Sequence, residues 1–491
     1  MNIKSTKKLL KQNITLEDNG KRHRDENREI GVITYVFLAI FIGMIVYLGV
    51  FTQFKSRDVI NNTYNRRQQL LEERLIRGDI KSRDGDILAT TTGDDNSGNV
   101  RIYPYGKMFA HAVGYSTHGV LGVERMVNFK LLECDDNIIS KISNDLKGAK
   151  NKGNTVITTL DTKMQKAAFD ALGSNKGAVF AMNAKTGEIL AVVSKPDFDP
   201  NEVDEQWELL NSDNVDSPLL NRAVLGVYAP GSTFKIVTAY EYLKENERSY
   251  TEYSYDCYGS FSYKGTTINC YHGQNHGEVD FNLSFAKSCN SSFANITSTL
   301  DKGSFEMTCK QLMFDTELPI PFPYSESHAT INVNSSTDEL LQTGIGQGKT
   351  LVTPAHIALI TAAIANDGVL MEPYIISSIE SVNGTVIEKR GPREYQVIMD
   401  EKDALVMQSF MRDVVLEGTA RRIKDTNGYQ VYGKTGSAEY SLDKTQSHAW
   451  FTGFANNEED SIVVTVIVEC GGSGGEVAAP IAKSVFDAYY E

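Results

Sequence analysis

Residues 31–51 form an apolar run of twenty-one residues without a single charged side chain. A helix rises about 1.5 Å per residue, so a helix of this length crosses a hydrocarbon core that is about 30 Å thick. A cleaved signal peptide has a shorter apolar stretch and a small-residue cleavage site, and no Ala-x-Ala pattern follows this run. A buried core helix is the other alternative. We expect one transmembrane helix over residues 30–52, preceded by a basic tail at residues 1–29.

The net charge changes sign between residues 1–29 and the remainder of the chain. The net charge is −14, but residues 1–29 carry eight Lys/Arg against five acidic residues, so the tail is positive and the remainder is strongly acidic. An acidic body argues against nucleic acid as the partner, whereas a basic tail is attracted to an anionic cytoplasmic leaflet or is simply solvated. Basic residues also follow the helix, but a long body is translocated largely regardless of flanking charge. We expect the tail in the cytoplasm and the body outside.

Residues 53–154 have the pattern of a small module that contains strands. Residues 76–80 and 83–89 predict two short strands around an Asp-Gly turn. Residues 141–154 are charged, contain glycine and hold few large apolar side chains, which is typical of a linker. We therefore expect a domain boundary just before residue 155.

Strand signals lie at both ends of residues 155–491, with helical stretches between them. This arrangement predicts a mixed α/β (α+β) fold in which one central, mainly antiparallel sheet is built from both ends and covered by helices on both faces. The expected strands are 156–160, 178–182, 189–193, 431–438, 449–454 and 462–468, and the expected helices include 162–172 and 481–490.

Ser232-x-x-Lys235 is the first motif that could support chemistry, and it opens an apolar helical run. Residues three apart share a helix face, so the two side chains are expected to lie together. A lysine whose pKa is lowered by burial and neighbouring positive charge can accept the serine proton and leave an activated nucleophile. The amides at the helix start would also favour developing negative charge.

Two further motifs are selected by context, because Ser-x-Asn and Lys-Thr-Gly each occur more than once. The Lys-Thr-Gly at 185–187 fits a hairpin turn, whereas Lys434-Thr435-Gly436 continues a strand and is followed by Ser437. Ser288-x-Asn290 follows a helical run, while the other Ser-x-Asn matches lie in polar loops or beside a turn.

In chain order, these three motifs resemble those of the penicillin-binding, penicilloyl-serine transferase family. The resemblance covers about residues 155–491 and extends to the stretches 177–194, 229–235, 344–348 and 450–453. Arg77-Gly78-x-Ile80 and Arg83-Asp84-Gly85 resemble the pedestal of the class B, transpeptidase-only members. The pedestal is shorter than in the larger class B members, and residues 53–154 leave no space for the glycosyltransferase domain of class A members.

The resemblance implies a peptidoglycan D,D-transpeptidase that cross-links stem peptides through an acyl-enzyme and is a target of β-lactams. Ser232 would attack the D-Ala-D-Ala carbonyl, with Lys235 as the base. Ser288 would pass the proton to the leaving D-Ala amine, and Asn290 would orient the substrate amide.

The third motif would bind the substrate. Lys434 and Thr435 would hold its terminal carboxylate. The amides of Ser232 and Ser437 would form an oxyanion hole, with Gly436 next to Ser437 in the same part of the site. The resemblance implies no cofactor and no metal. It also implies a single-pass protein of the bacterial cytoplasmic membrane whose partner is a multi-pass glycosyltransferase of the shape, elongation, division and sporulation (SEDS) type.

Two other functions share parts of this pattern. A β-lactamase or β-lactam sensor would use the same acylating serine, but Ser288-x-Asn290 in place of Ser-x-Val, together with the pedestal, argues against the class D-like forms. A catalytically idle cell-wall scaffold would not need the intact motif set.

Residues 257–276 contain Cys257, Cys270, His272 and His276, all of which can bind zinc, although their spacing matches no standard zinc motif. Outside the membrane, a disulfide between Cys257 and Cys270 is the simpler hypothesis. Free thiols and a metal site are the alternatives. Cys289, inside the Ser288-x-Asn290 motif, is expected to pack as a small apolar side chain.

Overall fold

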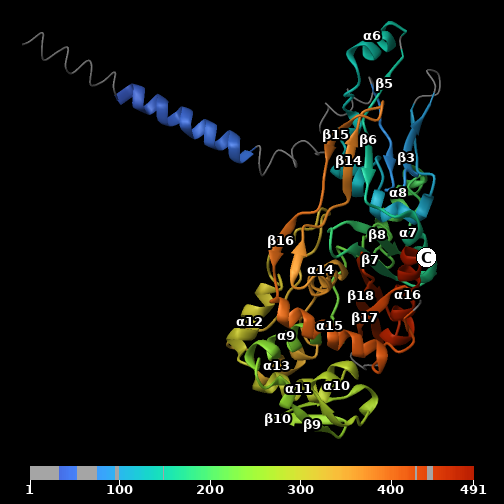
Figure 1. Ribbon diagram of the computed structural model, residues 1–491. Coiled ribbons are helices and arrows are strands. Elements are labelled where there is room, and N and C mark those ends of the chain that lie inside the picture. The colour runs from blue at the N-terminus through green and yellow to red at the C-terminus, as the bar shows by residue number, and fades with distance from the viewer. Residues whose placement is uncertain (1–31, 52–74, 94–98, 148, 426–427, 440–445) are drawn as a thin grey trace, which may run out of the picture. The chain divides into compact units, whose positions relative to one another are not determined.

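The computed structural model describes residues 32–51, 75–93, 99–147, 149–425, 428–439 and 446–491. The expected basic tail at residues 1–29 lies outside these ranges. A helix covers Val32–Val50 with a mean hydropathy of 2.4, and its side chains are exposed. The apolar run is therefore helical, and it is long and apolar enough to cross a membrane. The chain divides into a unit ending at Arg67 and a body that begins at Gln68 (Figure 1).

A five-stranded antiparallel sheet forms the centre of the body. Its strand order is β17-β18-β19-β7-β8, so strands from early and late in residues 155–491 meet where β19 pairs with β7. Every residue of β7, β8 and β19 is buried, as expected for apolar strands that are covered on both faces. The prediction of one sheet built from both ends is confirmed for five of the six expected strands. The strands are β7 (Gly177–Asn183), β8 (Ile189–Lys195), β17 (Gln430–Glu439), β18 (Ser447–Asn456) and β19 (Ser461–Val468). The strand expected at residues 156–160 is β6 (Thr155–Thr158), which lies in the other large sheet because it pairs with β2 and β14 instead.

Helices cover both faces of this sheet. Helices α7 (Thr162–Leu172) and α16 (Ala479–Tyr490) pack against each other and against the sheet, as the sequence predicts. Helix α14 (Pro354–Ala365) packs against β7, β18 and β19, and α15 (Glu401–Leu416) packs against β17. Between β8 and α14 lie the helices α8 (Val203–Ser212), α9 (Lys235–Glu245), α10 (Phe281–Ala286), α11 (Asn290–Thr299), α12 (Lys302–Gln311) and α13 (Thr337–Gly344).

The pedestal is organised around a six-stranded sheet with the order β15-β14-β6-β2-β3-β4. Strands β2 and β3 form the predicted antiparallel pair around the Asp-Gly turn, where Gly85 has a φ of 92°. Strands β14 and β15 come from far along the chain and complete the sheet by pairing β14 with β6. The strands are β2 (Ile80–Lys81), β3 (Ile87–Thr92), β4 (Val100–Ile102), β6 (Thr155–Thr158), β14 (Ile376–Glu380) and β15 (Val386–Lys389).

The segment expected as a linker contains a helix and a short strand. Helix α6 spans Ile138–Leu146, and β5 (Asn151–Lys152) pairs in parallel with β1 (Leu75–Ile76). The side chains of Ile142 and Leu146 are spaced four apart on this helix and are exposed. The role of residues 141–154 as a linker between domains stays a prediction.

A buried charge cluster stabilises the pedestal around Glu124, which lies on α5 (Gly122–Met126) and is fully buried. Arg77 contacts one carboxylate oxygen at 2.5 Å and Arg101 contacts the other at 2.7 Å. Burial alone would raise the pKa of Glu124, but the charges of Arg101 and Arg77 outweigh that effect and lower the pKa. The Arg77 of the sequence motif therefore serves an internal ion pair.

A small β lobe lies between α9 and α10, at the end of the body opposite the six-stranded sheet (Figure 1). It consists of two separate antiparallel pairs, β9 with β12 and β10 with β11. The strands are β9 (Ser254–Cys257), β10 (Ser260–Tyr263), β11 (Thr266–Asn269) and β12 (Gly277–Asp280). Isolated two-stranded pairs are marginally stable in water, so this lobe depends on what it packs against.

Candidate active site

Ser232 lies in a short 3-10 helix, Gly231–Phe234, that runs directly into α9. A loop passes close behind this helix, and the Gly231 amide donates a 2.8 Å hydrogen bond to the Gly346 carbonyl. Gly346 has a φ of +79°, and a Cβ there would lie 1.8 Å from the Gly231 carbonyl oxygen. Only glycine allows this close approach, which fixes the backbone beneath Ser232.

Lys235 is fully buried one helical turn after Ser232. Its ammonium nitrogen donates to the Ser288 carbonyl at 2.7 Å, to the Ser288 hydroxyl at 3.2 Å and to the Asn290 side-chain oxygen at 2.7 Å. Burial lowers the pKa of Lys235 to about 8. A lysine in this state can take up and release a proton near neutral pH.

Ser288 lies between α10 and α11 in a left-handed conformation, with a φ of 56°. Its hydroxyl also accepts a 2.8 Å hydrogen bond from the Lys434 ammonium group. Lys434 is fully buried, and its burial and the charge of Lys235 hold its pKa well below the usual range. Two lysines therefore converge on the hydroxyl of one serine, whose backbone has a left-handed conformation that is uncommon for a non-glycine residue.

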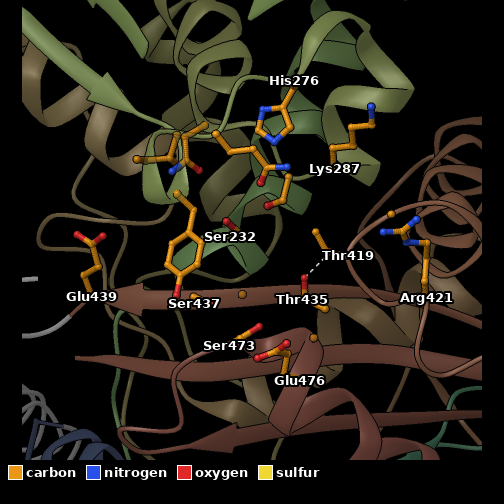
Figure 2. Close-up of a pocket in the computed structure, with 18 of the residues that line it drawn as sticks. Ser232, His276, Lys287, Thr419, Arg421, Thr435, Ser437, Glu439, Ser473 and Glu476 are labelled. Carbon is orange, nitrogen blue, oxygen red and sulfur yellow. Dashed lines mark hydrogen bonds between the residues drawn. The ribbon is translucent and has the colours of Figure 1, made fainter. Parts of the chain in front are cut away.

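The third motif lies on β17, the outermost strand of the central sheet. Lys434, Thr435, Gly436 and Ser437 pair in register with Thr452 to Ala449 of β18, so the strand holds them rigidly along the edge of a cavity. The cavity has a volume of about 390 Å³. Figure 2 shows Ser232 between this strand and the opposite wall, which carries His276 and Lys287.

The structure brings the predicted site residues together. Ser232, Ser288, Asn290, Thr435, Gly436 and Ser437 line the cavity, while Lys235 and Lys434 are buried next to Ser288. The second Lys-Thr-Gly, at residues 185–187, lies in the β7–β8 hairpin turn, as the sequence indicates.

Sequence reasoning missed several residues of the same cavity. The hydroxyl of Thr419 shares a 2.6 Å hydrogen bond with that of Thr435 (Figure 2). Thr419 follows α15 and reaches the site because the Thr419 amide donates to the Ala286 carbonyl at 3.2 Å and Gly418 packs closely against the same carbonyl. The Gly-Thr pair after a long helix was the only local signal. Other lining residues are Tyr271, Gln347, Arg421, Arg422, Glu439 and Glu476.

The fold and the site together define a serine acyltransferase in which a Ser-x-x-Lys helix, a Ser-x-Asn turn and a Lys-Thr-Gly edge strand surround one cavity. The family models agree with this class. Residues 177–487 match the penicillin binding protein transpeptidase domain, and residues 77–156 match the penicillin binding protein A dimerisation domain. The chain therefore belongs to the penicillin-binding protein family, as a class B member with a pedestal ahead of its transpeptidase domain.

Relatives extend this similarity over nearly the whole chain. The peptidoglycan D,D-transpeptidase PbpA of Mycolicibacterium smegmatis is 30% identical over 92% of this chain and 97% of its own length. MrdA of Acinetobacter baumannii, also a peptidoglycan D,D-transpeptidase, is 29% identical over 79% of this chain and 65% of its own length. Penicillin-binding protein A of M. tuberculosis, solved as a ceftriaxone acyl-enzyme complex, superposes with a TM-score of 0.78 at 28% identity, covering 86% of this chain and 99% of that one.

Proposed function

We propose that this chain is a membrane-anchored peptidoglycan D,D-transpeptidase that forms an acyl-enzyme on Ser232 and is acylated there by β-lactams. The observation that supports this most strongly is the convergence of Lys235 and Lys434 on the Ser288 hydroxyl, beside a cavity that Ser232 also lines. The relatives named D,D-transpeptidases and the acyl-enzyme structure support the same reaction class.

The lowered pKa of the buried Lys235 supports a mechanism for acylation of Ser232. With a pKa near 8, Lys235 is partly neutral at physiological pH and can take the Ser232 proton as the hydroxyl attacks the carbonyl of the D-Ala-D-Ala bond. The Ser288 hydroxyl would pass a proton from Lys235 to the departing D-Ala amine, and its hydrogen bond with Lys235 supports this role. An amine of a neighbouring stem peptide then takes the acyl group and releases Ser232.

The edge strand supplies substrate binding. Thr435 lines the cavity, and Lys434 is buried beside it with its ammonium group on the Ser288 hydroxyl. The two side chains would bind the terminal carboxylate of the stem peptide, and a charge-assisted contact of this kind is stronger than a neutral one. Asn290 would orient the substrate amide. The amides of Ser232 and Ser437 would hold the oxyanion, and a single donor of this kind contributes about 3 kcal/mol to barrier lowering.

The same proposal fixes the placement of the chain. The helix Val32–Val50 spans the cytoplasmic membrane, the basic tail lies in the cytoplasm, and the pedestal over residues 53–154 carries the transpeptidase domain of residues 155–491 outside. The partner that would supply glycan strands is a multi-pass SEDS-type glycosyltransferase. The positive tail and the acidic body support this orientation.

The test is to incubate the full-length chain, in detergent, with a fluorescent penicillin and to measure its acylation. We expect stable labelling of the wild type and none of Ser232→Ala. Ser5→Ala, which disrupts a Ser-x-x-Lys match in the tail, should label like the wild type. Folded Ser232→Ala that still labels, or wild type that does not, would refute the assignment. Label that is lost by hydrolysis within seconds would indicate a β-lactamase.

A matched pair of variants tests the third motif. Lys434→Ala should lose labelling, whereas Lys185→Ala, in the Lys-Thr-Gly of the hairpin turn, should retain it. Equal labelling of both variants would remove Lys434 from the site.

A further inference from the structure

Four potential metal ligands meet directly behind the Ser288-x-Asn290 turn. Cys257 ends β9, Cys270 follows β11, His276 precedes β12, and Cys289 lies inside the motif itself. One ligand atom from each of the four residues lies within 4.8 Å of all the others. The three cysteines are buried, and the histidine is partly buried on the cavity wall (Figure 2).

Three distances between the ligand atoms match those of a tetrahedral zinc site. Zinc binds thiolates at about 2.3 Å, so two sulfurs on a tetrahedral ion lie about 3.8 Å apart. The Sγ atoms of Cys257 and Cys270 are 3.7 Å apart, as are those of Cys270 and Cys289. The His276 Nδ1 atom lies 3.3 Å from the Cys257 sulfur. A disulfide needs a sulfur separation of about 2.05 Å, so no disulfide joins these cysteines in the structure.

The surroundings of the sulfur atoms suit thiolates. The Ser291 amide donates to the Cys270 sulfur and the Ser292 amide donates to the Cys289 sulfur, each at 3.4 Å. The Ser291 hydroxyl lies 3.1 Å from the sulfurs of both Cys257 and Cys270. Outer contacts of this kind orient ligands and stabilise the charge that a metal requires.

The cysteines lie apart from the apolar core that the rest of the lobe packs against. The three thiols form a buried cluster of their own, with Tyr255 as the partly buried apolar neighbour and no aliphatic side chain among its members. Two isolated strand pairs meet there, and short β units of this kind are commonly held by a metal or a disulfide.

We propose that Cys257, Cys270, His276 and Cys289 bind one zinc ion. The ion joins the β lobe to the start of α11 and holds Cys289, which is covalently linked to both Ser288 and Asn290. Its role is structural: it keeps the strained Ser288 turn in the position where Lys235 and Lys434 reach the serine hydroxyl. Zinc binding goes beyond the proposed transpeptidase activity and is measured independently of it.

The first experiment measures metal content. Full-length chain, purified in detergent without chelator and dialysed, should hold one zinc per chain by elemental analysis, and cobalt in its place should give a thiolate-to-cobalt charge-transfer band. Cys257→Ser and His276→Gln should each bind zinc at least about tenfold more weakly. His276 is only partly buried, so its substitution should leave the fold intact. Weaker zinc binding by His276→Gln then reports the loss of a ligand and not misfolding.

Cys309→Ser is the matched control, because Cys309 is equally buried but lies on α12, outside the cluster. It should retain zinc and the cobalt band. Wild type that neither holds zinc nor takes it up from a zinc buffer would overturn the proposal. So would non-reducing peptide mapping that finds a Cys257–Cys270 disulfide in the chain purified from membranes, or loss of the cobalt band in Cys309→Ser alone.

The second experiment links the metal to the turn. Removal of zinc by a chelator should slow penicillin acylation of Ser232 about tenfold, and added zinc should restore the rate. A chain that binds zinc but acylates equally fast without it would overturn the positioning role. A wild type that binds zinc but is never acylated would refute the transpeptidase proposal and leave the metal site standing.

Discussion

The pedestal and the active site both bury charged side chains completely, but they treat the charge in opposite ways. In the pedestal, Glu124 lies between Arg77 and Arg101, so the buried charge is compensated. In the active site, Lys235 and Lys434 share the Ser288 hydroxyl, and neither has a carboxylate within ion-pair distance among the residues that the structure describes.

This difference separates a structural charge from a reactive one. A compensated ion keeps its charge, and removing one partner destabilises the fold. An uncompensated ammonium group instead shifts towards its neutral form, which is the form that can act as a base. The two regions should therefore respond differently to the same kind of substitution.

Lys235→Met should have the largest effect. Loss of the general base should slow penicillin acylation about a thousandfold, while thermal unfolding should occur at the same or a higher temperature because a buried uncompensated charge has been removed. Acylation rates from stopped-flow fluorescence and calorimetry of the full chain test this. A strong loss of stability would mean that Lys235 is a structural charge like those of the pedestal.

Glu124→Gln should reverse the pattern. The variant leaves Arg77 and Arg101 buried without a counter-charge, so we expect a loss of about 3–5 kcal/mol in the free energy of unfolding of the body. Penicillin acylation per folded molecule should be unchanged. Denaturant titration together with labelling measures both, and an unaltered unfolding midpoint would contradict the structural role.

Changes in pH should affect the active site under alkaline conditions and the pedestal under acidic conditions. Acylation should rise with pH through about 8, since the pKa of Lys235 is lowered to that value from 10.5, and the same shift should make stability rise between pH 8 and 10.5. The pKa of Glu124 is lowered from 4.5, so its stabilisation is present above that pH and is lost as the pH falls below it. Acylation that is flat from pH 6 to 10 would contradict the assignment of Lys235.

Thr419→Val should have the smallest effect. It removes a hydroxyl that bonds Thr435 at 2.6 Å but alters neither buried lysine. The loss of one such hydrogen bond is expected to slow acylation about two- to tenfold, with little change in stability. Equal rates for variant and wild type would show that Thr435 needs no support from the loop after α15.

The central fold was predictable because its signals are local. Strands β7, β8 and β19 are continuous apolar runs that are buried on both faces, and helix α7 begins at residue 162, as its pattern predicts. The motif residues were likewise predictable once each was placed on a helix, turn or strand. Ser288 was identifiable, but its left-handed backbone was not, since nothing in its residue type requires one.

What the sequence did not indicate are contacts between distant segments. The pairing of β14 with β6 joins residues 376–380 to residues 155–158, and no local pattern favours that partner. The convergence of Cys257, Cys270, His276 and Cys289 was equally hidden, because their spacing matches no standard motif. Thr419 reaches the site only through the packing of α15 against α10.

The six-stranded sheet combines strands of the pedestal with β14 and β15 from far along the chain. The pedestal is therefore not a segment that can be swapped between proteins. Strands β14 and β15 connect, through β13 (Val369–Met371) and β16 (Glu394–Val397), to α14 and α15 on the catalytic side. A chimera joined at residue 155 would therefore separate a strand from its neighbour and expose a bare sheet edge. By the same connection, a mechanical load applied to the pedestal would be carried by the backbone into the helix that ends just before Thr419.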